Sequence, residues 1–313
     1  ELNKNNGTTN SAEGFNYKDK SVVFRLFVNQ NGVDATEGIT TIYDKTVGDL
    51  TTEDVLPSGW EFADIEENTK FYLFKASDTP GSMTVGERID SYDSFLSAAF
   101  SDENGLTPAK ATFTFTKLDE PYVIFVKARP TAETLNGYFN DNKTTTVENI
   151  LKFKTKENLT LASDTQKVSI ISQVLGKEMN KLENGVLKWT VSYRPYDIFQ
   201  NVPVLDKYRL IDTLPEGLEI YTDSQGNLDF SDGNFVVTEM VLTPSGYVAS
   251  GPVFTDQKLK DSISYDNVNR KLIFTIPNKD KAYRLEYKTM VTANSGNLTN
   301  TVALEGVSLN SVN

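Results

Sequence analysis

The chain has 313 residues, a formal net charge of −12 and a pI near 4.7, and it contains neither cysteine nor histidine. This composition excludes disulfides, metal sites with thiolate or imidazole ligands, and catalytic triads that use histidine. The acidic balance argues against nucleic acid or an anionic membrane surface as a partner, and no apolar run approaches the ~20 residues of a membrane span. We therefore expect no cofactor, no bound metal, no nucleic-acid partner and no membrane insertion.

The first half of the chain predicts a β-rich domain. Residues 1–19 are polar and are expected to form a flexible arm. Apolar and alternating runs predict strands at residues 21–28, 70–75, 111–116, 122–127 and 150–153. Residues 89–100 have helical spacing, with Ile89, Tyr92, Phe95, Leu96 and Phe100 near one face, and indicate a short helix inserted in this domain. The charged, threonine-rich stretch 154–163 is the best boundary, which gives expected domains at residues 20–157 and 158–313.

The second half predicts about seven strands, as an immunoglobulin-like sandwich requires. They are expected at residues 168–174, 186–193, 207–211, 235–242, 271–276, 283–291 and 298–304. Trp189 lies in the second of them and is expected in the core. Asp212 follows the third, just before the turn that Pro215 and Gly217 predict, so its side chain either points into the core or opens that turn.

Five pieces of the second half resemble a known domain family. They are Val-Leu-Gly-Lys at 174–177, the tryptophan strand at 187–193, Leu-Ile-Asp-Thr-Leu-Pro-Glu-Gly-Leu at 210–218, Tyr-Arg-Leu-Glu-Tyr-Lys at 283–288, and Asn-Leu-Thr-Asn-Thr-Val-Ala-Leu at 297–304. Their order and spacing over roughly residues 160–313 resemble the Cna-A type domain of Gram-positive surface adhesins and pilins. In that family a lysine is joined to an asparagine with the help of an aspartate. The resemblance implies that these residues are Lys177, Asn300 and Asp212.

Parts of the first half look like the Cna-B, prealbumin-like domains of pilins. The matching pieces are Phe71–Asp78, Ser101–Gly105 and Thr112–Val126. The family's glutamate position holds Val126, and its early lysine is missing from Phe24–Val28, so no cross-link is assigned to this half. The fold class expected for the whole chain is all-β, with two immunoglobulin-like or prealbumin-like sandwich domains in tandem.

A lysine–asparagine cross-link has a physical logic of its own. An amine attacks an amide only when it is neutral, and burial lowers the pKa of a lysine by disfavouring its charge. The same burial raises the pKa of a carboxyl group, so we expect Asp212 to stay protonated and to hydrogen-bond the Asn300 carbonyl. Folding holds Lys177 against the amide with an effective molarity of order 10⁵ M or more. The product is an isopeptide bond with loss of ammonia, in a single turnover, so the chain is not expected to be an enzyme.

Other interpretations of these residues stay open at the sequence level. Lys177, Asp212 and Asn300 are of types that are mostly exposed, and Lys181 and Lys188 are alternative amine donors. Lys188 alternates with Trp189 and is expected to face away from the core, while Lys181 lies in a polar run. The sequence Asp-Ser-Gln-Gly-Asn-Leu-Asp at 223–229 has oxygen ligands at alternate positions, but a solvated hairpin fits its glycine better than a calcium loop.

Together these features predict an extracellular segment of a Gram-positive surface adhesin or pilus subunit. It is expected to act as a binding or stalk module, anchored to the cell wall through segments outside this stretch. Its expected partners are a host extracellular-matrix or cell-surface protein, or neighbouring pilus subunits. The alternative is an extracellular carbohydrate-active enzyme that uses two of the 43 acidic residues as a carboxylate pair.

Overall fold

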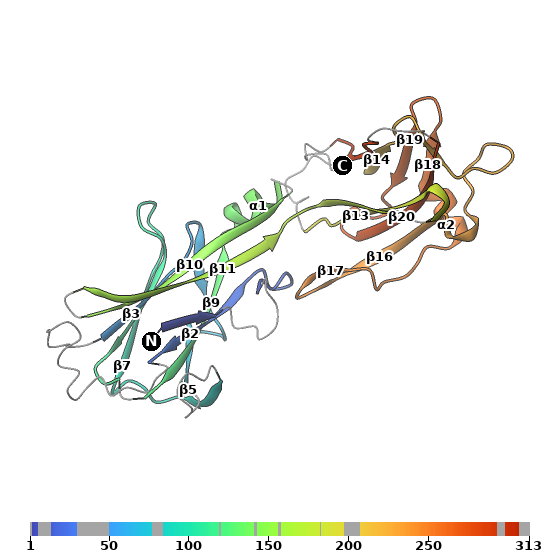
Figure 1. Cartoon of the computed structure of the whole chain (residues 1–313). Helices are drawn as coiled ribbons and strands as arrows, with labels where there is room; N and C mark the ends of the chain where they lie inside the picture. Colours follow the sequence, from blue (N-terminus) through green and yellow to red (C-terminus); the bar gives the residue numbers. More distant parts are fainter. Residues whose placement is uncertain are drawn as a thin grey trace. The chain divides into compact units, whose positions relative to one another are not determined.

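The structure of the chain is a computed structural model. It describes residues 2–5, 14–29, 50–76, 84–118, 120–140, 143–155, 158–181, 183–196, 207–292 and 298–306. The chain divides into two compact units (Figure 1). The first consists of Glu1–Leu135 and Thr145–Ile170, and the second of Asn136–Thr144 and Ile171–Asn313.

Two sheets form the first unit. One has the order β1-β2-β9-β5-β6, with β4 also pairing with β9. Its strands are β1 (Leu2–Asn5), β2 (Val22–Val28), β4 (Trp60–Ala63), β5 (Phe71–Ala76), β6 (Val85–Ile89) and β9 (Tyr122–Pro130). The other has the order β11-β10-β3-β8-β7. Its strands are β3 (Leu50–Val55), β7 (Leu96–Ser101), β8 (Lys110–Phe115), β10 (Thr144–Lys154) and β11 (Thr160–Ile171).

Aromatic side chains pack the two sheets of the first unit face to face. Phe71 of β5 meets Phe113 of β8 with ring centroids 5.2 Å apart, and Tyr122 of β9 stacks on Phe115 at 5.9 Å. β8 alternates strictly between buried and partly exposed residues, as expected of a strand with one face on a core. Val126, which occupies the family's glutamate position, is fully buried opposite Phe24.

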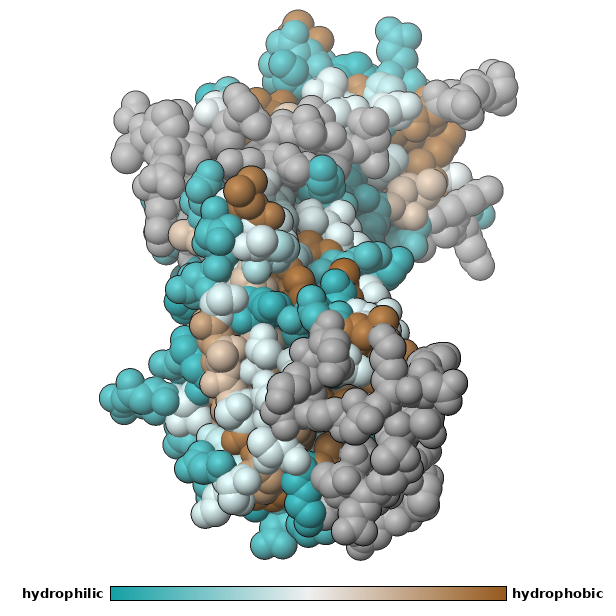
Figure 2. Space-filling model, turned by 90° about the vertical axis from the view of Figure 1, so that its left-hand side faces the viewer, coloured by the Kyte–Doolittle hydropathy of each residue, from teal (hydrophilic) through white to brown (hydrophobic). Residues whose placement is uncertain are grey.

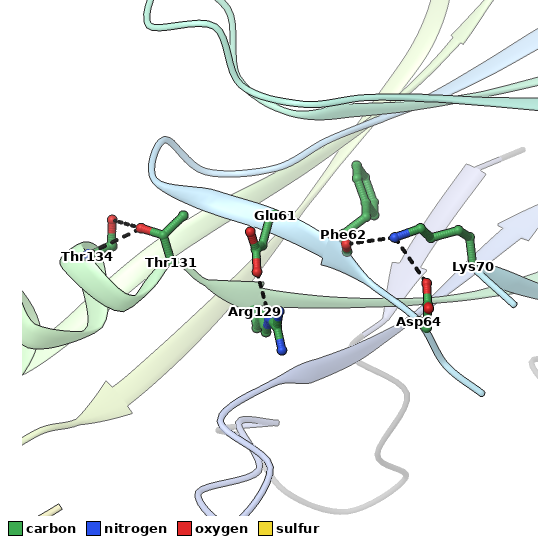
Figure 3. Close-up of polar contacts among 7 residues, drawn as sticks. All are labelled: Glu61, Phe62, Asp64, Lys70, Arg129, Thr131 and Thr134. Atoms are coloured by element: carbon green, nitrogen blue, oxygen red, sulfur yellow. Dashed lines mark hydrogen bonds and ion pairs between the residues drawn. The ribbon is translucent and has the colours of Figure 1, made fainter. Parts of the chain in front are cut away.

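Polar contacts between β4 and its neighbours lie at the surface (Figure 3). Glu61 accepts a hydrogen bond from Arg129 Nε at 2.7 Å. Lys70 Nζ donates to the backbone carbonyl of Phe62 at 3.3 Å and pairs with Asp64 at 3.0 Å. These charged side chains are about half exposed, so each ion pair contributes little to stability.

The helix predicted at residues 89–100 is wrong. β6 ends at Ile89, a turn occupies residues 93–95, and β7 begins at Leu96. Tyr92 and Phe100 both pack on Phe71, at 5.0 and 6.3 Å between centroids, so their apolar spacing serves a strand–turn–strand corner instead of a helix face. The described helices are α1 (Ala132–Asn140) and α2 (Asp256–Ser262).

Two further expectations for the first unit differ from the structure. The segment expected as an arm, residues 1–19, includes β1, which pairs with β2, and its Phe15 and Tyr17 are buried. The boundary expected between residues 157 and 158 falls between β10 and β11, and both strands belong to one sheet. The strand predicted at 168–174 is therefore the end of β11, which runs to Ile171.

The second unit also has two sheets. One has the order β12-β13-β20-β16-β17, with β15 also pairing with β20. Its strands are β12 (Leu175–Lys181), β13 (Val186–Tyr193), β15 (Leu218–Ile220), β16 (Phe235–Thr243), β17 (Gly246–Val248) and β20 (Ala282–Val291). The other has the order β18-β19-β14-β21. Its strands are β14 (Arg209–Thr213), β18 (Ile263–Asp266), β19 (Lys271–Thr275) and β21 (Thr301–Leu304).

One hydrophobic core joins the two sheets of the second unit. It includes Trp189 and Tyr287 from the first sheet and Leu210, Phe274 and Val302 from the second. The inward residues of each strand alternate with partly exposed ones, as they do along β13. The expected all-β fold class is confirmed, and six of the seven strands predicted for this half coincide with β13, β14, β16, β19, β20 and β21.

The surface is largely hydrophilic on the face drawn in Figure 2, where brown apolar residues are scattered among teal and pale ones. Neither described helix is long and apolar enough to cross a membrane.

Candidate functional site

Lys177 lies inside the second unit, although lysine is usually a surface residue. It is the third residue of β12 and pairs with Val191 of β13. The side chain is 0% exposed, and Nζ lies 5.0 Å from the centroid of the Trp189 ring. Trp189 is itself held by a hydrogen bond from Nε1 to Thr289 Oγ1 at 2.9 Å. An indole face and a sheet interior therefore surround the amine.

Asp212 comes from the opposite sheet. Leu210 and Asp212 are the inward residues of β14, each 2% exposed. The backbone at Asp212 pairs with Leu272 on one side and with Val302 on the other, so the residue is fixed within the sheet. The turn that Pro215 begins comes later in the chain, and Asp212 does not open it.

The Lys177 amine and the Asp212 carboxyl are in direct contact. Nζ donates a hydrogen bond to Oδ1 at 2.6 Å. Burial lowers the pKa of Lys177 to about 8, against the opposing effect of the Asp212 charge. Burial likewise raises the pKa of Asp212, although Lys177 and Tyr287 act in the other direction. Both shifts favour the neutral amine and the neutral acid, which is the protonation state that attack on an amide needs.

Tyr287 connects this pair to Asn300. Its hydroxyl donates to Asp212 Oδ2 at 2.6 Å and accepts from Asn300 Nδ2 at 2.7 Å. The ring stacks on Trp189, with centroids 6.5 Å apart and planes at 20°. Burial and the neighbouring carboxylate raise the pKa of the phenol well above its usual range, so Tyr287 keeps its proton at neutral pH.

Asn300 immediately precedes β21 and is 2% exposed. Its Nδ2 is held by Tyr287, whereas its Oδ1 is buried and has no hydrogen-bond partner among the residues that the structure describes. A buried carbonyl oxygen without a partner costs roughly 1–3 kcal/mol. In the Asn300 amide, therefore, the nitrogen is hydrogen-bonded and the oxygen is not.

The structure brings together the three residues singled out from the sequence, with one difference. Lys177 contacts Asp212 directly, but Asp212 does not donate to the Asn300 carbonyl as expected. Its second oxygen is used by Tyr287, which lies between acid and amide. Tyr287 was missed, although the alternation of Tyr283, Leu285 and Tyr287 is a signal that its side chain faces the core.

The chain is similar to three solved structures, each matched over nearly the whole of this chain. They are collagen adhesin (CNA) from S. aureus (12% identity, TM-score 0.29, 99% of this chain and 89% of that one), the MSCRAMM ACE from Enterococcus faecalis (9%, 0.28, 100% and 90%) and the major pilin SpaA from Corynebacterium diphtheriae (10%, 0.31, 97% and 59%). They are a collagen adhesin, an MSCRAMM and a pilin.

No protein-family model and no curated protein sequence matches the chain. At identities of 12% or less and TM-scores of 0.31 or less, any function for this chain has to be argued from its own side chains.

Of the two alternative amine donors, Lys188 is described and its amine does not contact Asp212, Tyr287 or Asn300. Lys188 points away from the core and pairs with Glu286 at 2.6 Å, with 37% of its side chain exposed. The side chain of Lys181 lies outside the described residues.

The segment 223–229 closes as a turn. Asp223 Oδ1 accepts from the backbone nitrogens of Gln225 and Asn227, both at 2.9 Å. The carboxylate therefore caps its own loop. Within the described ranges, no group of three or more acidic side chains is arranged to hold a metal ion.

Proposed function

We propose that the second unit closes an intramolecular isopeptide bond between Lys177 Nζ and Asn300 Cγ, and that the chain is a binding or stalk module of a surface adhesin or pilus subunit. The observation that carries the proposal is the fully buried amine. Lys177 is 0% exposed and hydrogen-bonded to an equally buried carboxyl group, and an unbroken chain of hydrogen bonds leads from that carboxyl group to the Asn300 amide.

A buried lysine and aspartate destabilise the folded state when both carry a charge. Removing an ammonium and a carboxylate from water costs several kcal/mol per ion, which their mutual attraction repays only with good geometry. Here the partial remedy is neutralisation, because the pKa of Lys177 falls to about 8 and that of Asp212 rises. The neutral pair is also the reactive pair: a free amine beside an acid, which Tyr287 links to the Asn300 amide.

The reaction would replace a destabilising buried lysine with an uncharged amide. The Lys177 amine adds to the Asn300 carbonyl carbon, the bond from Cγ to Nδ2 breaks, and ammonia leaves. One amide replaces another, and no charged lysine remains buried. Each molecule reacts once, so the activity is a step of maturation.

The role as an extracellular module rests on wider features of the chain. Two tandem sandwiches without cysteine would have to withstand proteases and tension outside the cell without disulfides. An amide cross-link supplies covalent reinforcement that no reductant breaks. The partners of such a module would be a host matrix or cell-surface protein, or neighbouring subunits of a pilus.

Intact-mass spectrometry of the purified full chain tests the cross-link. We expect the wild type to weigh less than its sequence by one ammonia, because bond formation releases that molecule. Lys177→Met and Asn300→Ala should each have the full mass of their own sequences, and a peptide map of the wild type should contain the Lys177–Asn300 branch.

Lys188→Met is the matched control for the lysine, since it lies on the neighbouring strand and pairs at the surface. This variant should still lose one ammonia. A folded wild type at the full sequence mass would show that no such bond forms.

A further inference from the structure

The amide nitrogen of Asn300 is the group that must leave, and it is the only side of that amide with a hydrogen-bond partner in the described part of the chain. Nδ2 lies 2.7 Å from the Tyr287 hydroxyl, whereas Oδ1 is buried without a partner. The site is therefore built around the leaving group and not around the carbonyl oxygen. The acid expected to polarise the carbonyl, Asp212, reaches the amide only through Tyr287.

We propose that Tyr287 is a catalytic residue of the cross-linking reaction, which delivers the proton that turns the Asn300 amide nitrogen into ammonia. This inference rests on the proposed isopeptide bond. Its basis is the row of three contacts, 2.6, 2.6 and 2.7 Å long, that runs from Lys177 Nζ through Asp212 and Tyr287 to Asn300 Nδ2. The nucleophile and the leaving group are the two ends of one proton path.

The protons balance along this path. Lys177 first passes one proton to Asp212, which gives an amine and a carboxylic acid. Addition of the amine to Cγ turns Nδ2 into the nitrogen of a tetrahedral intermediate, which can accept a proton. The two hydrogen bonds of Tyr287 then reverse, so that Asp212 donates its proton to the Tyr287 oxygen while the phenol proton moves to Nδ2. The bond from Cγ to Nδ2 then breaks, ammonia departs, and the new amide nitrogen gives its surplus proton to Asp212. Tyr287 ends as a phenol, and Asp212 ends as a neutral acid.

The surroundings suit Tyr287 to this role. The side chain belongs to the core, and Trp189 stacks on its ring, so the hydroxyl is held in place between the two sheets. Water does not reach Nδ2, because Asn300 is 2% exposed and Tyr287 1% exposed. A proton for the departing nitrogen therefore has to come from a side chain, and the Tyr287 hydroxyl is the one in contact with it.

Tyr287→Phe removes the hydroxyl and keeps the ring. The full chain, made by cell-free synthesis and quenched in denaturant at set times, would be followed by intact mass. We expect the ammonia to be lost roughly 10²–10⁴-fold more slowly than in the wild type, as for loss of a positioned acid. Tyr283→Phe is the matched control, being a buried tyrosine of the same strand that packs on Phe254 instead of the cluster, and it should react at the wild-type rate.

A second variant separates proton delivery from mere positioning. Site-specific 3-fluorotyrosine at position 287 keeps the ring and the hydroxyl but makes the phenol more acidic. Proton delivery predicts a changed rate, whereas a purely structural hydroxyl would leave the rate at the wild-type value and overturn the inference. This variant also serves if Tyr287→Phe fails to fold.

The outcomes for Tyr287 and for the bond itself differ. A wild type that never loses ammonia contradicts the proposed function. A wild type that loses it, with Tyr287→Phe reacting equally fast, leaves the bond in place and contradicts the role of Tyr287 alone.

Discussion

Asp212 has two opposing effects on the reactivity of Lys177. Its negative charge raises the pKa of the amine and so reduces the fraction that is neutral, while its carboxyl oxygen accepts the proton that the amine must lose. Burial is the larger influence on Lys177 and lowers its pKa to about 8. If Asp212 acts mainly as a proton acceptor, its removal slows the reaction. If its negative charge is the larger effect, its removal speeds the reaction.

We expect Asp212→Asn to slow the cross-link by roughly 10²–10⁴-fold, the usual worth of a positioned acid or base. The asparagine keeps the size of the side chain but cannot take a proton from Lys177. Its neutral amide also lowers the pKa of Lys177 further, so more free amine is present. Time-resolved intact mass checks the rate, with Asp261→Asn on α2 as an exposed control. A faster reaction would mean that supply of neutral amine is the only requirement.

The residues of the site differ in how far the sequence predicts them. Lys177, Asp212 and Asn300 are recognisable because their order, spacing and flanking strands match a family pattern. Tyr287 lies in one of the matching pieces, 283–288, but the resemblance gives it no role. Its alternation with Leu285 says that it faces the core and not what it contacts there. Its contact with Asp212 depends on how β20 of one sheet lies over β14 of the other, and that alignment is set by packing between sheets.

At the level of elements, the proposed bond would join the edges of two sheets. β12 is an edge strand of one sheet and β21 an edge strand of the other, and the two are in contact. β21 has only four residues and pairs with β14 alone. A short edge strand held on one side opens easily unless something else fixes it.

Hydrogen exchange followed by mass spectrometry should therefore detect the bond at β21. We expect the amides of Thr301–Leu304 to exchange faster in Asn300→Ala than in the wild type, because the variant loses the covalent tie one residue before the strand. Peptides from β19, which pairs with both β14 and β18, are the internal control and should exchange alike. Equal protection of β21 in both proteins would show that the sheet alone holds this strand.

The strands are more predictable than the helices in this chain. Regular alternation marks β8, β13 and β20, and a strand needs little else to be recognised. The stretch 89–100 has helical spacing as well, but its pairing with β5 and β8 prevails over that pattern. α1 was missed although a local signal exists: Thr131 accepts from the backbone nitrogen of Thr134, as an N-cap does (Figure 3).

For the whole molecule, the bond would matter because a covalent cross-link through cysteine is not open to it. The chain has no cysteine, so a disulfide is impossible. Lys177 and Asn300 are 123 positions apart (300 − 177), and a link between them closes most of the second unit into one loop. By the loop-entropy estimate used for disulfides, this removes roughly 4–5 kcal/mol of chain entropy from the unfolded state.

We expect the second unit of the wild type to melt higher than that of its unbonded variants, by on the order of 10 °C for this gain in a unit of this size. Scanning calorimetry on Lys177→Met and Asn300→Ala measures the difference. The two variants alter opposite ends of the cluster, so a decrease common to both reports the missing bond, and any difference between them reports lost packing. Lys188→Met, which keeps the bond, should melt like the wild type, and reducing agent should change none of the four. If the cross-linked wild type melted no higher than the two unbonded variants, the bond would have to serve something other than stability, such as resistance to force along the two sheet edges that it joins.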